Sequence, residues 1–449
     1  MTETSAAASV AGNVWTCPFC PLACDHLGVG CGSGAETLVL QGGACARASR
    51  ALAQFTGAPP DVSAQVDARP CDLNTAVATA ARLLAASRQP LFAGLGTDVA
   101  GARALYPLAC ATGAICDAVA GEALMHGLRA LQDRGQFTTT LAEVRTRADL
   151  IVFVGGLPTD LAPLIGPRCG IGEAQGPQRQ VVVLGPAPGD DATLAAWAAL
   201  AAAGSVSVDS VPLHGDLFDT LALLAALLTG PVPAPGARTP PAASPALQAL
   251  AQRLRAARYA VLVGAPANLP AQGALIVEAV HQVVGSLNRS TRAAALWVGG
   301  GNGAATVNQV FAWLSGLPLR SRAGPLGLEH EPLLFDTARL LTDDAVDALL
   351  WVASFDAQAL PPPNRLPMIV LGHPALAASV ATTGARRGLP TVFIPISTPG
   401  IGSAGHMFRT DGTVLMPLDA VVRDGLPALA DALGRITAEL RALREGATV

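Results

Sequence analysis

Short apolar segments that end in or near glycine recur along the chain, and several lead into segments with helical periodicity. The alternation of strand, glycine turn and helix predicts an α/β fold with parallel sheets, whose ligands bind at the carboxyl ends of the strands. A single glycine turn is an ordinary connection, so only the repetition supports this prediction. The predicted strands lie at residues 90–96, 148–156, 181–185, 259–264, 347–354, 368–372 and 391–395, and residues 296–302 are predicted to form a glycine-rich turn.

A proline-rich segment, residues 230–245, interrupts this pattern and predicts a linker or an exposed crossover. We therefore expect five consecutive parts in the chain. They are a cysteine module (1–57), a first α/β domain (58–229), the linker, a second α/β domain (246–395) and a C-terminal segment (396–449) whose amphipathic helix, Leu426–Glu445, packs back on the α/β body.

Four cysteines near the amino terminus have the spacing C-x2-C-x3-C-x20-C. Thiolates at such close spacing hold iron–sulfur clusters, whereas structural zinc sites favour two separated C-x2-C pairs or mixtures of cysteine and histidine. We predict a [4Fe-4S] site, with a zinc site and a set of buried structural cysteines as the alternatives. Val29 and Leu38–Leu40 predict short strands around the ligand loop, and Ala44–Phe55 predicts a helix. The candidate ligands are Cys17, Cys20, Cys24 and Cys45.

The composition limits the classes of partner. Of the 449 residues, 51% are hydrophobic and only 14% are charged, which predicts that other subunits cover much of the surface. The net charge of −4 and the absence of a basic run argue against nucleic acid. The apolar runs at 193–203 and 221–228 fall short of the ~18 residues that would span a bilayer. We expect them to be buried helices, and we expect no membrane association.

Other features of the sequence limit the possible reactions and the cellular location of the protein. Residues 1–12 contain Glu3 and no positively charged stretch, so we expect no signal or transit peptide and a cytoplasmic protein. Nine cysteines would then be ligands or free thiols rather than disulfides. All 29 basic residues are arginine, which excludes Schiff-base chemistry, pyridoxal phosphate and a Walker-type lysine. The seven histidines show no spacing typical of a hydrolytic zinc site.

The cysteine cluster followed by two α/β halves resembles the molybdopterin oxidoreductases. A more specific set of segments, at 140–156, 301–318, 347–354 and 398–412, is similar to the B subunit of formylmethanofuran dehydrogenase and extends the likeness over most of the chain. The resemblance implies a molybdopterin-oxidoreductase-like fold, a [4Fe-4S] cluster on the four cysteines, and a molybdopterin guanine dinucleotide with molybdenum or tungsten. From their places at strand ends and helix starts, where phosphates bind backbone amides, the candidate cofactor-binding residues are Gly155, Gly156, Gly301, Asn302 and Asn308.

The chain departs from that family at its implied metal ligand. The family has a cysteine that ligates the metal, followed by a histidine suited to proton transfer, and the matching pair here is Cys116 and Asp117. These two are the candidate catalytic residues. A thiolate can ligate the metal, and a small buried core residue is the alternative role for Cys116. Aspartate, with an ordinary pKa of ~3.9 against ~6.5 for histidine, is a poor proton carrier at neutral pH. Because few residues follow Arg409 in this sequence, we also expect the superfamily's C-terminal β-barrel domain to be absent.

These departures favour a related bacterial assembly, the formyltransferase/hydrolase complex. It keeps a B-like subunit without the tungsten chemistry, and it transfers and hydrolyses a formyl group in tetrahydromethanopterin-linked formaldehyde oxidation to formate. We expect a mainly structural B-type chain with a degenerate redox site, beside amidohydrolase-like, formyltransferase and C-type subunits that handle a methanofuran-type formyl carrier. The alternatives are an active Mo/W-pterin and [4Fe-4S] formylmethanofuran or formate dehydrogenase subunit, and a zinc-stapled binding module.

Overall fold

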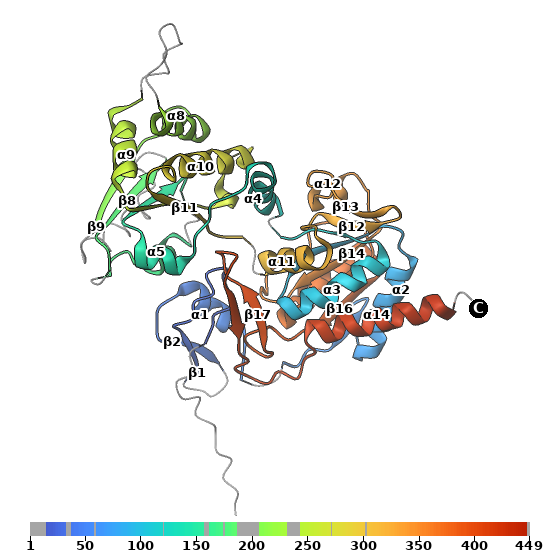
Figure 1. Ribbon diagram of the computed structural model, residues 1–449. Helices are drawn as coiled ribbons and strands as arrows, with labels where there is room; N and C mark the ends of the chain where they lie inside the picture. The colour runs from blue at the N-terminus through green and yellow to red at the C-terminus, as the bar shows by residue number, and fades with distance from the viewer. Residues whose placement is uncertain are drawn as a thin grey trace, which may run out of the picture. The chain divides into compact units, whose positions relative to one another are not determined.

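The chain folds into two α/β units, each with its own sheet (Figure 1). Unit 1 comprises residues 1–119, 301–408 and 415–449, and unit 2 comprises residues 120–300 and 409–414. The predicted α/β fold with parallel sheets is confirmed. The structure is a computed structural model that describes residues 15–32, 37–57, 60–119, 121–156, 161–173, 176–185, 206–230, 243–270, 272–300 and 303–446.

Unit 1 contains a nine-stranded sheet with the order β13-β12-β6-β5-β14-β15-β16-β3-β4. The five strands from β6 to β16 in this order are parallel, and the two at each edge run antiparallel to their neighbours. The longer parallel strands are buried along nearly their whole length, because helices cover both faces of the sheet. The strands are β3 (Ala64–Val66), β4 (Arg69–Cys71), β5 (Pro90–Gly96), β6 (Ile115–Cys116), β12 (Ser321–Gly324), β13 (Gly327–His330), β14 (Ala348–Ala353), β15 (Met368–Gly372) and β16 (Thr391–Pro395).

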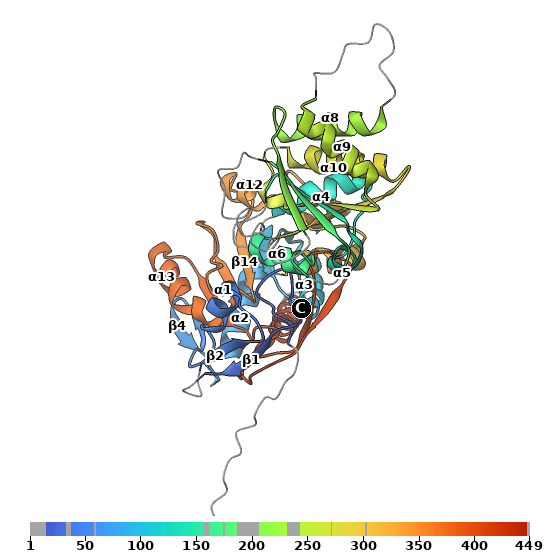
Figure 2. The ribbon, with the colours of Figure 1, turned by 90° about the vertical axis from the view of Figure 1, so that its left-hand side faces the viewer.

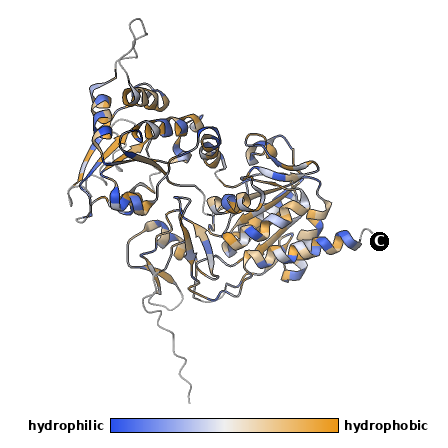
Figure 3. Cartoon of the chain, in the orientation of Figure 1, coloured by the Kyte–Doolittle hydropathy of each residue, from blue (hydrophilic) through white to orange (hydrophobic). Residues whose placement is uncertain are grey.

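The helices of unit 1 form two layers. α2 (Leu73–Ala86), α3 (Val99–Thr112), α11 (Ala304–Ser315) and α14 (Leu429–Gly446) lie together on one side of the sheet (Figure 1). On the other face, α12 (Thr337–Thr342), the short helix η2 (Pro374–Leu376) and α13 (Ala377–Arg387) contribute to a core with Trp351 and Phe393. The amphipathic C-terminal helix predicted from the sequence corresponds to α14, whose hydrophobic and hydrophilic residues alternate along it (Figure 3).

The cysteine module is part of unit 1. β1 (Gly28–Cys31) and β2 (Leu38–Gln41) form an antiparallel pair, and α1 (Ala46–Leu52) follows, as predicted. A separate hairpin in unit 1 is made by β17 (Gly405–Phe408) and β18 (Leu415–Leu418). The module has its own core, which also includes a residue from far along the chain. Its members include Trp15, Phe19, Leu27, Leu52 and Ile401.

Unit 2 contains a five-stranded parallel sheet with the order β11-β10-β7-β8-β9, which Figure 2 shows from the side. One face of this sheet shares a core with α8, α9 and α10. Leu221 and Leu224 in α8 are fully buried, which confirms the buried helix predicted at 221–228. The elements are α4 (Gly121–Arg134), α5 (Leu141–Arg147), β7 (Leu150–Val154), α6 (Ala162–Arg168), β8 (Arg179–Leu184), β9 (Val206–Val211), α8 (Leu217–Thr229), α9 (Pro245–Ala256), β10 (Tyr259–Gly264), η1 (Pro266–Asn268), α10 (Gly273–Leu287) and β11 (Arg292–Trp297).

The two units differ from the consecutive domains expected from the sequence. β10 pairs with β7, and β14 pairs with β5, so strands from both expected halves share each sheet. The ends of the proline-rich segment meet α8 and α9, which pack together within unit 2, so the segment does not separate two domains. Residues 231–242 and the helix expected at 193–203 lie outside the described residues. Among the helices that the structure describes, none combines the length and apolarity needed to span a membrane.

Candidate functional site

The nine-stranded sheet has a reversal point between β5 and β14. From β5 the chain moves outward to β6, and later it returns to the other side of β5 and continues through β14, β15 and β16. In parallel α/β sheets, ligands bind outside the carboxyl ends of the strands at such a point. Thr97 and Asp98 follow β5, and Ser354 follows β14, with its backbone N–H donating to the Gly96 carbonyl at 2.9 Å.

Buried polar residues collect at this carboxyl edge, and most of them bind one another or the backbone. Asp98 caps α3 by accepting from the backbone N–H groups of Gly101 at 3.0 Å and Ala100 at 3.2 Å. The Thr398 hydroxyl donates to the Ser354 carbonyl at 2.8 Å. These hydrogen bonds connect the loops that follow the strands.

Two buried polar atoms at this edge have no hydrogen-bond partner within the described residues: Ser354 Oγ and His373 Nε2. His373 directly follows β15, and its Nδ1 accepts from the Ala375 N–H at 3.1 Å, so Nε2 carries the proton of the neutral ring. Burial lowers the pKa of His373 to about 4. A buried donor without an acceptor costs about 1–3 kcal/mol, so a water molecule or another acceptor would stabilise this position.

The sequence analysis did not identify Ser354 or His373, although each directly follows an apolar strand. Gly303, at the start of α11, also touches this edge. A Cβ at this glycine would lie 2.4 Å from the Thr97 nitrogen, and its φ is +81°, so no other residue fits there. The predicted Gly301 and Asn302 lie outside the described residues. Asn308 is buried in α11, and its Oδ1 accepts from the Leu319 N–H at 3.0 Å, which anchors the chain before β12.

The predicted glycines Gly155 and Gly156 follow β7 in unit 2. Both adopt positive φ, +74° and +80°. They lie at the second reversal point, between β7 and β10 in the five-stranded sheet. The Gly155 N–H donates to the Leu184 carbonyl at 2.9 Å and so holds the neighbouring strand end. Their binding of a cofactor phosphate stays a prediction.

Cys116 ends the short strand β6 and is buried. Burial raises the pKa of its thiol, and the neighbouring Cys110 and Asp117 raise it further. The cavity beside it, lined in part by Tyr106, Cys110 and Phe311, has a volume of only about 10 Å³. A cavity of that size holds about one water molecule. The residues around Cys116 therefore do not fit a pterin-bound metal in this conformation.

Asp117 is part of a buried ion network. Its Oδ1 accepts from Arg320 Nε at 3.2 Å, and its Oδ2 accepts from the Thr337 N–H and hydroxyl, each at 2.9 Å. The Arg320 guanidinium, only 1% exposed, also pairs with Asp336 at 2.6 Å. Burial raises the pKa of Asp117, and Arg320 and the Thr337 donors oppose that shift. The carboxylate thus connects β6 to the start of α12.

The four predicted ligand cysteines lie in one loop module. Cys17 and Cys20 are buried, and Cys24 and Cys45 are half-buried. The Cys17 N–H donates to the Cys24 carbonyl at 2.9 Å and closes the loop, while Cys45 Sγ caps α1 by accepting from the Ala48 N–H at 3.5 Å. Burial raises the pKa of Cys17 and of Cys20, and the N–H groups of Phe19 and Leu22, respectively, oppose these shifts.

Four thiols with N–H groups near their sulfurs are chemically suited to an iron–sulfur cluster or to zinc. However, no group of three or more His, Cys, Asp and Glu side chains in the described part of the chain is arranged to hold a metal ion. Metal binding would have to draw the sulfurs together and release their protons, a coupling common in small metal-bound modules. The cluster stays a prediction.

The comparisons with known proteins agree with this fold. No family model matches the chain. The B subunit of the formyltransferase/hydrolase complex of Methylorubrum extorquens is 34% identical over 299 residues, which are 66% of this chain and 76% of that protein. The B subunit of tungsten-containing formylmethanofuran dehydrogenase 2 of Methanococcus maripaludis is 33% identical over 195 residues, which are 40% of this chain and 44% of that one.

One solved structure extends the likeness to the fold. The crystal structure of the Methylorubrum extorquens formyltransferase/hydrolase complex with methylofuran contains a chain that matches with a TM-score of 0.69 and 29% identity. The match covers 86% of this chain and 100% of that one. The resemblance seen in the sequence is confirmed, and the chain belongs to the family of B subunits of the formyltransferase/hydrolase complex.

Proposed function

We propose that this chain is a mainly structural B-type component of a formyltransferase/hydrolase complex and that its own redox centre is not operative. Its partners would be amidohydrolase-like, formyltransferase and C-type subunits, with a methanofuran-type formyl carrier bound by the complex. The similar chain in a complex that contains methylofuran supports these partners. The two similar B subunits support a molybdopterin-oxidoreductase-like fold.

The observation that carries this proposal is the closed surroundings of Cys116 and Asp117. The thiol has a cavity of about 10 Å³ beside it, too small for a metal with its pterin. The Asp117 carboxylate accepts four hydrogen bonds, from Arg320, from Thr337 twice and from the Ala118 N–H. Protonating it would break a buried ion pair, which costs several kcal/mol, so it is unsuited to carry protons.

A structural role also accounts for exposed apolar side chains on unit 1. Leu326, at the turn between β12 and β13, is 99% exposed, and Leu333 and Trp313 are more than half exposed. Large apolar side chains left in water are typical of surfaces that other subunits cover.

The test is to express the other subunits with wild-type chain, without it, and with a Cys116→Ala variant. We expect no assembled complex without the chain. With Cys116→Ala we expect normal assembly and normal formyl transfer and hydrolysis, because the thiol is a buried core group. Loss of activity in a fully assembled Cys116→Ala complex would contradict the proposal and favour a working metal site.

Iron and zinc analysis of the same anaerobic preparation addresses the cysteine module. Iron near four per chain supports a retained [4Fe-4S] cluster on Cys17, Cys20, Cys24 and Cys45 beside the structural role. Zinc alone supports the zinc-stapled module.

A further inference from the structure

The crossover from β14 to β15 lacks a helix. Adjacent parallel strands are usually connected by one, which then covers the sheet. Here residues 354–367, which the structure describes in full, run as an irregular loop that includes Pro361, Pro362 and Pro363. The Trp351 indole N–H donates to the Ala359 carbonyl at 2.8 Å and fixes the loop to the strand below it. Consecutive prolines have fixed φ angles and no N–H group, so this loop is stiff and cannot form a helix.

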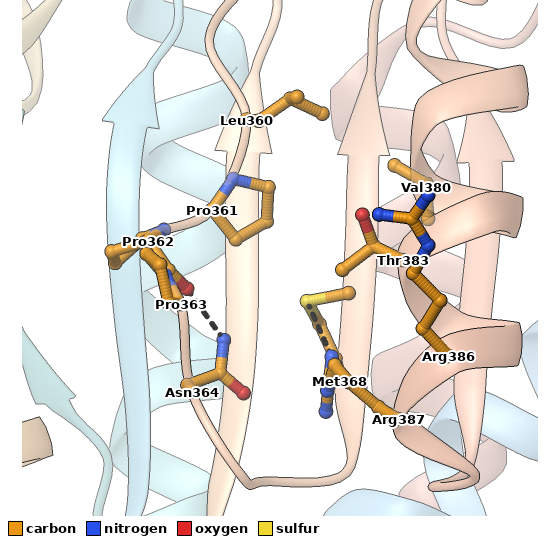
Figure 4. A pocket seen from close by; sticks show the side chains of 10 residues that line it. All are labelled: Leu360, Pro361, Pro362, Pro363, Asn364, Met368, Val380, Thr383, Arg386 and Arg387. Carbon is orange, nitrogen blue, oxygen red and sulfur yellow. Dashed lines mark hydrogen bonds between the residues drawn. The ribbon is translucent and has the colours of Figure 1, made fainter.

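A pocket of about 320 Å³ remains between this loop and α13 (Figure 4). Its volume is within the range of about 300–1,000 Å³ typical of small-molecule sites. Pro361 lies on one side, and Met368, the first residue of β15, and Val380 supply apolar surface. Thr383, Arg386 and Arg387 lie on the α13 side (Figure 4). Because Met368 begins its strand, the pocket lies at the opposite end of β15 from His373.

The charge of the pocket is positive. Two arginines and no acidic residue line it. Within the described residues Arg386 is exposed and has no ion pair or hydrogen bond. Arg387 Nη2 donates to the Leu366 carbonyl of the loop, and Nη1 donates to Met368 Sδ at 3.4 Å. Its buried Nε has no partner in the described part of the chain. Neither guanidinium binds a carbonyl of α13 itself, so helix capping does not explain this pair of cations.

We propose that this pocket binds a small organic anion. Its carboxylate, phosphate or sulfonate group pairs with Arg386 and Arg387, and its flat apolar body packs against Met368, Val380 and the proline rings. Arginine pairs well with such groups because its planar donors match their oxygens. The site is separate from the carboxyl edge of the sheet and from the cysteine module, so it is independent of the proposed function.

The test uses the full chain and two fluorescent probes that differ in one charge. 8-Anilinonaphthalene-1-sulfonate has a flat apolar body and a sulfonate, and N-phenyl-1-naphthylamine is its neutral counterpart. We expect one sulfonate probe bound per chain, at least about tenfold weaker binding in Arg386→Gln, and unchanged binding of the neutral probe in that variant. Inorganic phosphate should compete with the sulfonate probe.

Two further variants locate the binding. Thr383→Trp fills the pocket from an exposed rim position and should abolish binding of both probes. Arg435→Gln removes the same charge from an exposed position on α14 and should bind as the wild type does. Equal affinity of wild type and Arg386→Gln for the sulfonate probe would overturn the proposal. A folded Thr383→Trp chain that binds the probes as tightly as the wild type would also overturn it. The same holds if the wild-type chain binds neither probe and Thr383→Trp prevents assembly with the other subunits.

Discussion

Removal of the Asp117 carboxylate tests whether this position is structural. Asp117→Ala leaves Arg320, 1% exposed, without one of its two carboxylate partners and leaves two Thr337 donors unpaired. Breaking a buried ion pair costs about 3–5 kcal/mol. Asp336 still pairs with Arg320 in the variant, so we expect the lower end, a loss of about 3 kcal/mol in the free energy of unfolding.

The assay is equilibrium unfolding in urea, with a matched control at an exposed ion pair. Arg339 and Asp343 are 3.4 Å apart and about half exposed, so Asp343→Ala should cost less than about 1 kcal/mol. If Asp117→Ala unfolds at the same urea concentration as the control, the carboxylate has no structural role and this reasoning is refuted.

Three other predictions concern the edge of the sheet and the cysteine module. Burial lowers the pKa of His373 in the folded chain to about 4 from 6.5. The unfolded chain therefore binds this proton more readily than the folded chain. As a result, the free energy of unfolding is highest above pH 6.5 and decreases as the pH falls from 6.5 towards 4. Between pH 4 and 6.5 the rise in the free energy of unfolding, measured in urea, should be roughly 3 kcal/mol smaller in His373→Gln than in the wild type. Part of the rise should remain in the variant, because burial also lowers the pKa of His281 to about 4. Gly303→Ala should cost more than about 2 kcal/mol by the same assay, whereas Gly316→Ala, with φ +80° and an open Cβ position, should cost about 1; equal costs would contradict the close contact. After anaerobic reconstitution with iron and sulfide, wild type and Cys31→Ser should form a brown chromophore and Cys20→Ser should not; colour retained in Cys20→Ser would exclude it as a ligand.

The parallel strands could be predicted from the sequence because they are buried on both faces and read as continuous apolar runs. β5, β10, β14, β15 and β16 all have this pattern. Shorter or half-exposed strands gave no such signal. β6 has two residues, and β9 at the edge of its sheet alternates partly buried and exposed positions.

The grouping of strands into units could not be predicted, because pairing depends on contacts between distant segments. β7 pairs with β10 more than a hundred residues later, and no local pattern marks that partnership. The composition at 230–245 indicates a break in the regular structure and predicts a linker or an exposed crossover. In the structure this break falls between two helices of the same core.

The candidate site was predictable only in part, for a similar reason. Spacing and family resemblance located the cysteines, Cys116 and Asp117. Arg320 could not be predicted, because an arginine is expected to be exposed. Only the fold shows that Arg320 is buried against a carboxylate. His373 and Ser354 could not be predicted either, because a single polar residue after a strand is common. Their buried atoms without a hydrogen-bond partner in the described part of the chain can be recognised only in the structure.

The most direct test of the structural role is the molybdenum and tungsten content of the assembled complex, purified without oxygen and measured per copy of this chain. The closed cavity at Cys116 predicts that neither metal rises above the background of a preparation lacking this chain. Either metal at close to one atom per chain would contradict the account, since it would show that the site opens and holds a working redox centre.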